Sequence, residues 1–168
     1  MKNSKKLTLY TSRGAIIASL YVVLTTLASI AGLSSGVIQF RISEALCILP
    51  IFLPEAVPAL FIGCMLSNII AGGVVVDVIF GAVATLIGAI SARLMRRLPD
   101  RLVWLTTVPT ILANALIVPL ILIYAYGSEE AYVFIAFTVF IGEAVCAGIG
   151  GTLLYPLLKK LKFFKKNT

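Results

Sequence analysis

Long apolar runs separated by short polar turns are the feature that most constrains how this chain of 168 residues folds. A helix needs about 20 apolar residues to cross the roughly 30 Å hydrocarbon core of a bilayer, and several runs approach or exceed that length. Charged residues make up only 12% of the sequence, too few to cover the surface of a soluble domain. The sequence therefore predicts an integral membrane protein.

The basic residues indicate how the chain crosses the membrane. Apart from Arg41, they lie in three clusters, and the positive-inside rule places all three in the cytoplasm. An even number of spans must then separate each cluster from the next. The clusters are Lys2, Lys5, Lys6 and Arg13; Arg93, Arg96, Arg97 and Arg101; and Lys159, Lys160, Lys162, Lys165 and Lys166.

Turn-forming residues divide the apolar sequence into six helices. Turn signals lie at 34–36, 54–58 and 72–73, and the polar segment YGSEE at 126–130 predicts an external turn. We expect an all-α membrane protein, with one six-helix domain over residues 1–168 and both termini in the cytoplasm. The expected helices lie at about 14–33, 43–53, 56–71, 74–97, 102–125 and 131–157.

Three prolines at four-residue spacing shape the second and third helices. Proline removes a backbone donor and clashes with the preceding turn, so Pro50, Pro54 and Pro58 should kink or end the second helix and begin the third. The second helix is too short to span the membrane straight. The first run has no cleavage site of the kind that follows a signal peptide, so we expect a retained helix.

Several chemistries are excluded by what the sequence lacks. Without histidine there is no HExxH metal site and no Ser/His or Cys/His pair, and we expect neither a metal site nor catalytic residues. Cys47, Cys64 and Cys146 show no CxxC spacing and are expected to be buried thiols. No GxxxxGK[ST] loop is present, so the chain does not use ATP by that mechanism. The net charge of +7 lies mostly in helix flanks that face anionic lipid headgroups, and we expect no nucleic-acid partner.

A few polar residues remain within the apolar sequence, and most fall near the outer surface. The exceptions are Asn114 and Glu143, which lie about 18 Å from their helix ends, near the bilayer centre. An ionised carboxylate facing lipid there costs at least about 2.5 kcal/mol, so Glu143 is expected to face a protein interior or a wet cavity, or to be protonated. A hydrogen bond between Glu143 and Asn114 that only joins two helices is the alternative. The residues are Gln39, Arg41, Glu44, Asn68, Asp77, Asn114 and Glu143.

Structural interpretations compete with binding roles near the outer surface. Ser43 can N-cap the second helix, which leaves Glu44 in the first turn at the positive end of the helix dipole. Asp77 occupies the same place in the fourth helix, where we favour capping. Arg41 can pair with Glu44, but it departs from the orientation bias of the other cations, so we favour a binding role for it.

Small residues at four-residue spacing let helix backbones approach closely. We interpret the stripes in the fourth and sixth helices as packing within the bundle. The stripe in the first helix lies near the cytoplasm, so contact with a partner protein is a second option there. The stripes are Gly14 and Ala18; Ala84, Gly88 and Ala92; and Gly142, Cys146 and Gly150.

Two stretches, QFRISEALCILP at 39–50 and PALFIGCMLSNIIAGGVVVDVIFGAVATLIGAISA at 58–92, resemble the QueT family. Its members are S components of energy-coupling factor (ECF) transporters implicated in the uptake of queuosine precursors. The similarity extends more loosely through TILANALIVPL and IGEAVCAGIGG, so it covers nearly the whole chain.

The resemblance implies a six-helix S component of the plasma membrane, a binding protein rather than an enzyme. It implies three partner proteins, a transmembrane coupling subunit and two cytosolic ATPases that use ATP, and no cofactor in this chain. It also implies docking through small residues of the first helix, here Gly14, Ala15 and Ala18.

The resemblance further places a ligand in the outward half of the bundle, under loops that correspond here to 34–42, 72–73 and 126–130. The implied ligand is a 7-deazaguanine such as preQ1, preQ0 or queuine. Its adjacent ring N–H and amine groups suit a carboxylate, and its carbonyl suits an amide or guanidinium.

The polar residues divide between these roles. Glu143 or Glu44 is expected to accept from the ring, Asp77 to meet an aminomethyl cation, and Tyr21 and Phe80 to stack on the base. The alternatives are an S component for another small aromatic vitamin, an intramembrane enzyme or a purely structural membrane protein. The residues expected to donate to the carbonyl are Asn114, Asn68 and Arg41, while Gln39 lies in the adjoining loop.

Overall fold

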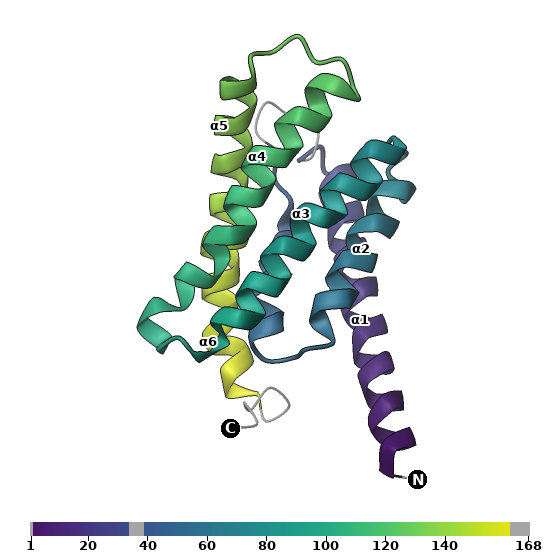
Figure 1. The fold of residues 1–168 in the computed structure, drawn as a ribbon, viewed down its shortest axis with the longest axis vertical. Helices are drawn as coiled ribbons and strands as arrows, with labels where there is room; N and C mark the ends of the chain where they lie inside the picture. The colour runs from purple at the N-terminus through teal and green to yellow at the C-terminus, as the bar shows by residue number, and fades with distance from the viewer. Residues whose placement is uncertain (1, 34–38, 162–168) are drawn as a thin grey trace.

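The structure, a computed structural model, describes residues 2–33 and 39–161, and every regular element in those ranges is helical (Figure 1). The elements follow one another as six helical segments, three of which change helix type along their length. The segments are α1 (Lys2–Ile30); η1 (Ile42–Ile51); α2 (Ala56–Ile70); α3 (Val75–Leu94) with η2 (Met95–Arg97); η3 (Asp100–Thr107) with α4 (Val108–Tyr124); and α5 (Tyr132–Glu143), η4 (Ala144–Gly150) and α6 (Gly151–Lys160).

Four of these segments are long and apolar enough to cross a membrane, namely Ser4–Ile30, Val75–Arg97, Asp100–Tyr124 and Tyr132–Lys160. The chain is therefore an all-helical membrane protein. The other two, η1 and α2, are apolar but shorter. Six membrane-spanning helices remain a prediction, because η1 and α2 are too short for their length alone to show that they cross the membrane.

The first helix is longer than expected. It begins at Lys2 rather than near residue 14, because the basic segment before the apolar run contains no helix-breaking residue and continues the same helix. It ends at Ile30, and Gly32 adopts the left-handed conformation, with φ of 72°, that closes many helices. Residues 34–38, which include the turn signal at 34–36, lie outside the described residues.

The short η1 element lies in the middle of the protein and contacts α1, α3, η4 and α6. Eight of its ten residues are buried, which explains an apolar helix that is too short to span. The η1 helix ends at Ile51, one residue after Pro50. Pro54 lies in the following turn, and Pro58 lies in the first turn of α2. The expected effect of the prolines is confirmed.

The expected cap of η1 is wrong. Arg41, not Ser43, is the N-cap residue, and no side chain caps that end of the helix. The Ser43 hydroxyl instead accepts a hydrogen bond of 2.8 Å from Thr25 in α1. At the other end of η1, Arg93 donates to the carbonyl of Pro50 at 3.1 Å, so the cation satisfies a carbonyl that the helix leaves free.

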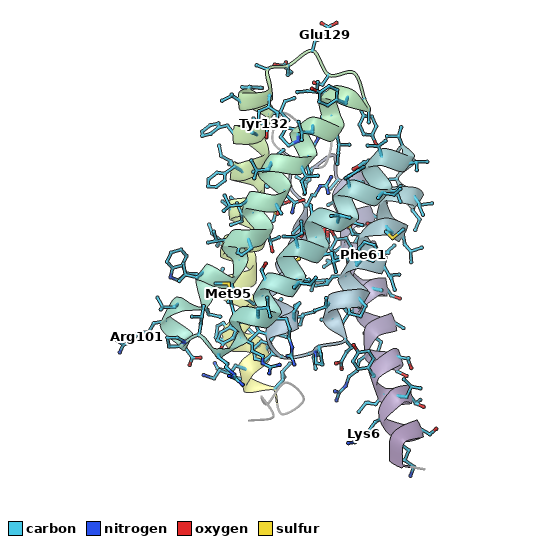
Figure 2. The ribbon with its side chains drawn as sticks, viewed as in Figure 1. Lys6, Phe61, Met95, Arg101, Glu129 and Tyr132 are labelled. Atoms are coloured by element: carbon cyan, nitrogen blue, oxygen red, sulfur yellow. The ribbon has the colours of Figure 1, made fainter. Side chains whose placement is uncertain are left out.

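The two ends of the bundle differ in charge. Figure 2 places Lys6 and Arg101 at one end and Glu129 at the other, and α1 begins and α6 ends at the same end as Lys6. We call this the basic end. The opposite one, which contains the turns after Ile30, Ile70 and Tyr124, is the loop end. The assignment of the basic end to the cytoplasm stays a prediction from the positive-inside rule.

Close packing of helices rests on the small-residue stripes. A Cβ at Gly88 of α3 would lie 2.2 Å from the Thr110 hydroxyl of α4, and a Cβ at Gly150 would lie 3.3 Å from Ala45 of η1. Ala84 and Ala92 of α3 are fully buried. The interpretation of these two stripes as packing within the bundle is confirmed.

Candidate functional site

Four polar side chains on different helices lie at one depth in the bundle. Tyr21 in α1, Thr85 in α3, Asn114 in α4 and Glu143 in α5 each lie about ten residues from the loop end of their helix. At 1.5 Å per residue this places them roughly 15 Å below that end. All four are buried, with at most 1% of their surface exposed. Since 15 Å is half the hydrocarbon thickness, they form a polar layer at mid-membrane depth.

Glu44 of η1 belongs to this layer, and both of its carboxylate oxygens are occupied. Oε1 accepts hydrogen bonds from the hydroxyls of Tyr21 and of Thr85, the latter at 2.9 Å, and Oε2 accepts from the thiol of Cys47 at 3.0 Å. A carboxylate only accepts hydrogen bonds when ionised, and three donors satisfy it well. The carboxylate of Glu44 therefore ties η1 to α1 and α3.

Glu143 and Asn114 present the opposite situation. The amide nitrogen of Asn114 donates to the carbonyl of Thr110 at 3.1 Å, within α4. Within residues 2–33 and 39–161, Glu143 Oε2 and Asn114 Oδ1 are buried without a hydrogen-bond partner, and so is the Thr110 hydroxyl. A buried polar atom left unpaired costs about 1–3 kcal/mol, so these atoms are candidates to contact a ligand.

Two expectations about Glu143 are decided by this geometry. Its side chain is 1% exposed, so the expectation that it faces the protein interior is confirmed. No hydrogen bond joins it to Asn114 in the described part of the chain, so the two residues do not act as a simple link between helices. The Glu143 carboxylate interacts electrostatically with Glu44 and with the Arg41 guanidinium.

Three of the predicted residues meet nearer the loop end, around Gly81 of α3. A Cβ at Gly81 would lie 2.9 Å from the amide nitrogen of Asn68, 3.2 Å from Asp77 Oδ1 and 3.9 Å from Arg41 Nη1. The amide of Asn68 also donates to the carbonyl of Asp77 at 3.1 Å. Glycine keeps this space open, so an amide, a carboxylate and a guanidinium face one small region.

Arg41 does not pair with Glu44. Among the described residues no ion pair joins them, and the Arg41 guanidinium interacts with Asp77 and Glu143. The cation thus lies between the group around Gly81 and the mid-depth layer, which places it to contact a molecule bound between the two.

Tyr126 completes the group nearer the loop end and was not predicted. Its hydroxyl donates to Asp77 Oδ2 at 2.9 Å and accepts from the backbone N–H of Val74, the N-cap residue of α3, at 3.3 Å. The preferred capping role of Asp77 is therefore wrong, since Tyr126 takes the N–H that such a cap would use. Burial, followed by the hydrogen bond to Asp77, raises the pKa of Tyr126.

The remaining predicted ligand residues lie at the margins. Gln39 is half-buried, and part of its predicted loop, residues 34–38, lies outside the described residues. Phe80 is 51% exposed and faces outward, so the expectation that it stacks on a ligand is not supported. The hydroxyl of Tyr21 is engaged by Glu44, which fixes its ring at the border of the layer.

The three residues predicted to dock a partner differ in exposure. Ala15 is exposed, Gly14 is half-buried, and Ala18 is buried. A Cβ at Gly63 of α2 would lie 3.1 Å from the Ala18 carbonyl, so Ala18 packs against α2 within this chain. Docking through this helix stays a prediction, and Ala15 is its most accessible member.

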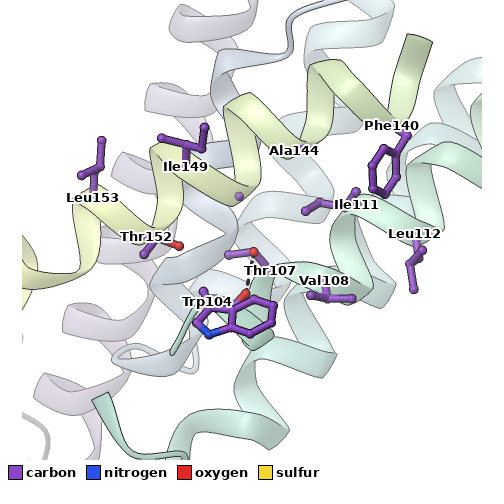
Figure 3. Close-up of a pocket in the computed structure, with 11 residues that line it drawn as sticks. Trp104, Thr107, Val108, Ile111, Leu112, Phe140, Ala144, Ile149, Thr152 and Leu153 are labelled. Atoms are coloured by element: carbon purple, nitrogen blue, oxygen red, sulfur yellow. Dashed lines mark hydrogen bonds between the residues drawn. The ribbon is translucent and has the colours of Figure 1, made fainter. Parts of the chain in front are cut away.

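The structure also contains two hollows away from these groups. One, of about 490 Å³, lies between the first part of α4 and the helices η4 and α6, and its lining includes Trp104, Leu112 and Phe140 (Figure 3). The other, of about 590 Å³, lies at the basic end beside Asp100 and Lys159. Neither is lined by the predicted ligand residues.

Comparison with known proteins gives one family and one curated relative. The family model described as "QueT transporter" matches residues 11–160. The "Queuosine precursor transporter QueT" of Lactococcus lactis subsp. cremoris (strain MG1363) is 42% identical over 87 residues, which is 52% of this chain and 50% of that protein. The chain thus spans about half the length of this relative. No solved structure matches the chain.

Proposed function

Because this chain belongs to the QueT transporter family, we propose that it is the substrate-binding S component of an ECF importer for a queuosine precursor. It captures the ligand from the loop end and carries out no chemical step. A transmembrane coupling subunit and two ATPases, which use ATP, drive release on the basic side. In this proposal the protein resides in the plasma membrane with both termini in the cytoplasm.

The unpaired mid-depth atoms are the observation that carries the proposal. Glu143 Oε2 and Asn114 Oδ1 are buried without partners in the described residues, whereas the oxygens of Glu44 are already occupied. Glu143 is therefore the carboxylate that accepts from the adjacent ring N–H and amine of a 7-deazaguanine. Glu44 holds the surrounding helices in place.

The group around Gly81 supplies the other contacts. The guanidinium of Arg41 is a donor suited to the ligand carbonyl. The amide of Asn68 already donates to the Asp77 carbonyl and, over 3.9 Å, to the sulfur of Cys64, so it can contact the ligand only in place of the long bond to sulfur. Asp77 Oδ1 faces the same space and suits the aminomethyl cation of preQ1. The ligand thus spans from the mid-depth layer toward the loop end.

Ligand-dependent thermal stabilisation of the purified protein tests this proposal. A ligand at 100 times its Kd stabilises the folded state by about 2.7 kcal/mol. We expect preQ1, preQ0 or queuine to raise the unfolding midpoint, and thiamine, riboflavin and guanine to leave it unchanged. Stabilisation by a vitamin and by no deazapurine would instead identify an S component for that vitamin.

A matched variant separates specific binding from general effects. Glu55 is 3% exposed and pairs with Arg13 at the basic end, away from the proposed site. Glu55→Gln should therefore retain the ligand-induced shift, while Glu143→Gln should lose it. An equal response of the two variants would contradict the assignment of Glu143.

A further inference from the structure

We propose that an anionic phospholipid occupies a groove that runs from Phe140 to Lys160 along the seam between η3–α4 and η4–α6. Its acyl chain lies along the apolar hollow of Figure 3. Its headgroup lies in the second hollow at the basic end. This site is separate from the proposed ligand site and does not depend on it.

The apolar part of the groove has the character of an acyl-chain site. Trp104, Leu112 and Leu153 line it and are each about half or more exposed in the isolated chain, so the hollow opens sideways toward the membrane. From Phe140 to Leu153 the helix advances roughly 20 Å. This length is comparable to the roughly 15 Å of hydrocarbon in one leaflet, so one extended chain fits along it.

The second hollow continues the first. Thr152 lines both, which joins them end to end. Beyond Thr152 the lining includes Lys159 and Lys160, both exposed, and Tyr155. Polar groups therefore begin where the apolar lining ends.

The charges at this end favour an anion. Asp100 pairs with Lys159 and accepts a hydrogen bond of 2.7 Å from the Tyr155 hydroxyl. Since the lining has two lysines and one aspartate, Lys160 leaves one net positive charge at the hollow. Basic pockets between membrane helices on the cytoplasmic side bind anionic lipid headgroups.

The position of Trp104 supports a lipid rather than a protein helix as the occupant. Tryptophan prefers the boundary between hydrocarbon and headgroups, and Trp104 lies in η3, which begins at Asp100 at the basic end. The groove is thus apolar at hydrocarbon depth and cationic at the interface. An anionic phospholipid likewise has an apolar chain at hydrocarbon depth and an anionic headgroup at the interface. A partner helix would not need an anionic group at the interface.

The chain's single tryptophan makes the test direct. Intrinsic fluorescence is measured in nanodiscs that contain increasing fractions of brominated phosphatidylglycerol or brominated phosphatidylcholine. Because one net lysine charge near a membrane surface contributes about 1 kcal/mol, we expect half-quenching at an about fivefold lower fraction of the anionic lipid. Equal quenching by the two lipids would overturn the proposal, and it is the result expected if the groove instead awaits a protein partner.

Paired double variants locate the site. Lys159→Ala/Lys160→Ala should abolish the preference for the anionic lipid. Lys5→Ala/Lys6→Ala removes the same charge from the N-terminal end of α1, away from the groove, and should keep the preference. An equal loss in both variants would show general attraction to an anionic surface and overturn the site. Unchanged helical content and thermal midpoints of both variants confirm that they fold.

Discussion

The hydroxyl of Thr85 in α3 donates a hydrogen bond of 2.9 Å to the carboxylate of Glu44 in η1, 41 residues earlier in the chain. Tyr21 of α1 donates to the same oxygen. One buried carboxylate thus joins three helical segments at mid-membrane depth. Since hydrogen bonds to charged groups are among the stronger ones in proteins, this cluster fixes the frame that surrounds the proposed ligand.

Thr85→Ala should destabilise the protein even without ligand. The variant removes one donor to a buried carboxylate, at a cost of about 1.5–3 kcal/mol. Thr85→Ser keeps the hydroxyl and should lie close to the wild type. Thermal unfolding in detergent measures both, and equal midpoints for the alanine and serine variants would contradict the role of the hydroxyl.

Gly88→Ala should disrupt the contact between α3 and α4. The added Cβ would lie 2.2 Å from the Thr110 hydroxyl and 2.9 Å from its Cα, and such overpacking typically costs about 1–3 kcal/mol. Gly14→Ala is the matched control, because its nearest neighbours would lie at 3.9 Å. We expect a lower unfolding midpoint for the first variant only, and a neutral Gly88→Ala would show that the helices are not in close contact.

Tyr126→Phe should loosen the link between α4 and the start of α3. The variant loses the hydrogen bonds to Asp77 and Val74, which together contribute about 1 kcal/mol at this partly exposed position. Hydrogen exchange should accelerate at the N–H of Val74 while α5 is unchanged. Uniform protection in both proteins would argue against the link.

The hydrogen bonds of Tyr126 to Asp77 and Val74 should persist at alkaline pH. The pKa of Tyr126 is raised by burial and by the bond to Asp77. A tyrosine with a raised pKa in the folded protein contributes stability that is complete below its ordinary pKa of about 10 and is lost as the pH rises through the raised value. The Tyr126→Phe difference in hydrogen-exchange protection should therefore be constant from neutral pH to about 10.

Ala15→Leu tests docking on α1 more cleanly than the buried Ala18 does. Ala15 is exposed, so leucine there should leave unfolding and ligand binding unchanged while it impairs assembly with the coupling subunit. Ala18→Leu should instead lower stability, because Ala18 packs against Gly63. Co-purification with the three partner subunits is the measurement, and normal assembly of Ala15→Leu would remove this face from the docking surface.

The sequence predicted the helices well because turn residues mark their ends. The third helix was expected at 56–71 and lies at Ala56–Ile70, bounded by a proline-rich turn and a glycine pair. The start of α1 was missed, because hydropathy does not detect a basic or amphipathic extension of a helix when no turn residue separates it from the apolar run. The same limit hides the change from 3-10 to α-helix within the segment that begins at Asp100.

The partners of each polar residue were harder to predict than its location. Glu143 was expected to face inward because lipid excludes a carboxylate, and it does. Glu44 was interpreted from its own helix, since spacing along one helix does not say which neighbour faces it. Thr85 could have been found, because it shares a helical face with the glycines at 81 and 88. Tyr126 gave no signal, since its role depends on two loops that meet only in the fold.

The central claim is that Glu143 and Asn114 contact the ligand, and a paired measurement of binding and stability in their alanine variants tests it most directly. Since Glu143 Oε2 has no partner in the described residues, Glu143→Ala should unfold near the wild-type midpoint. Asn114→Ala also loses the hydrogen bond to the Thr110 carbonyl, so its midpoint should fall by the equivalent of about 1 kcal/mol. Each variant should bind preQ1 or queuine at least about tenfold more weakly, a loss of about 1.4 kcal/mol. Unchanged affinity in both variants would contradict the account.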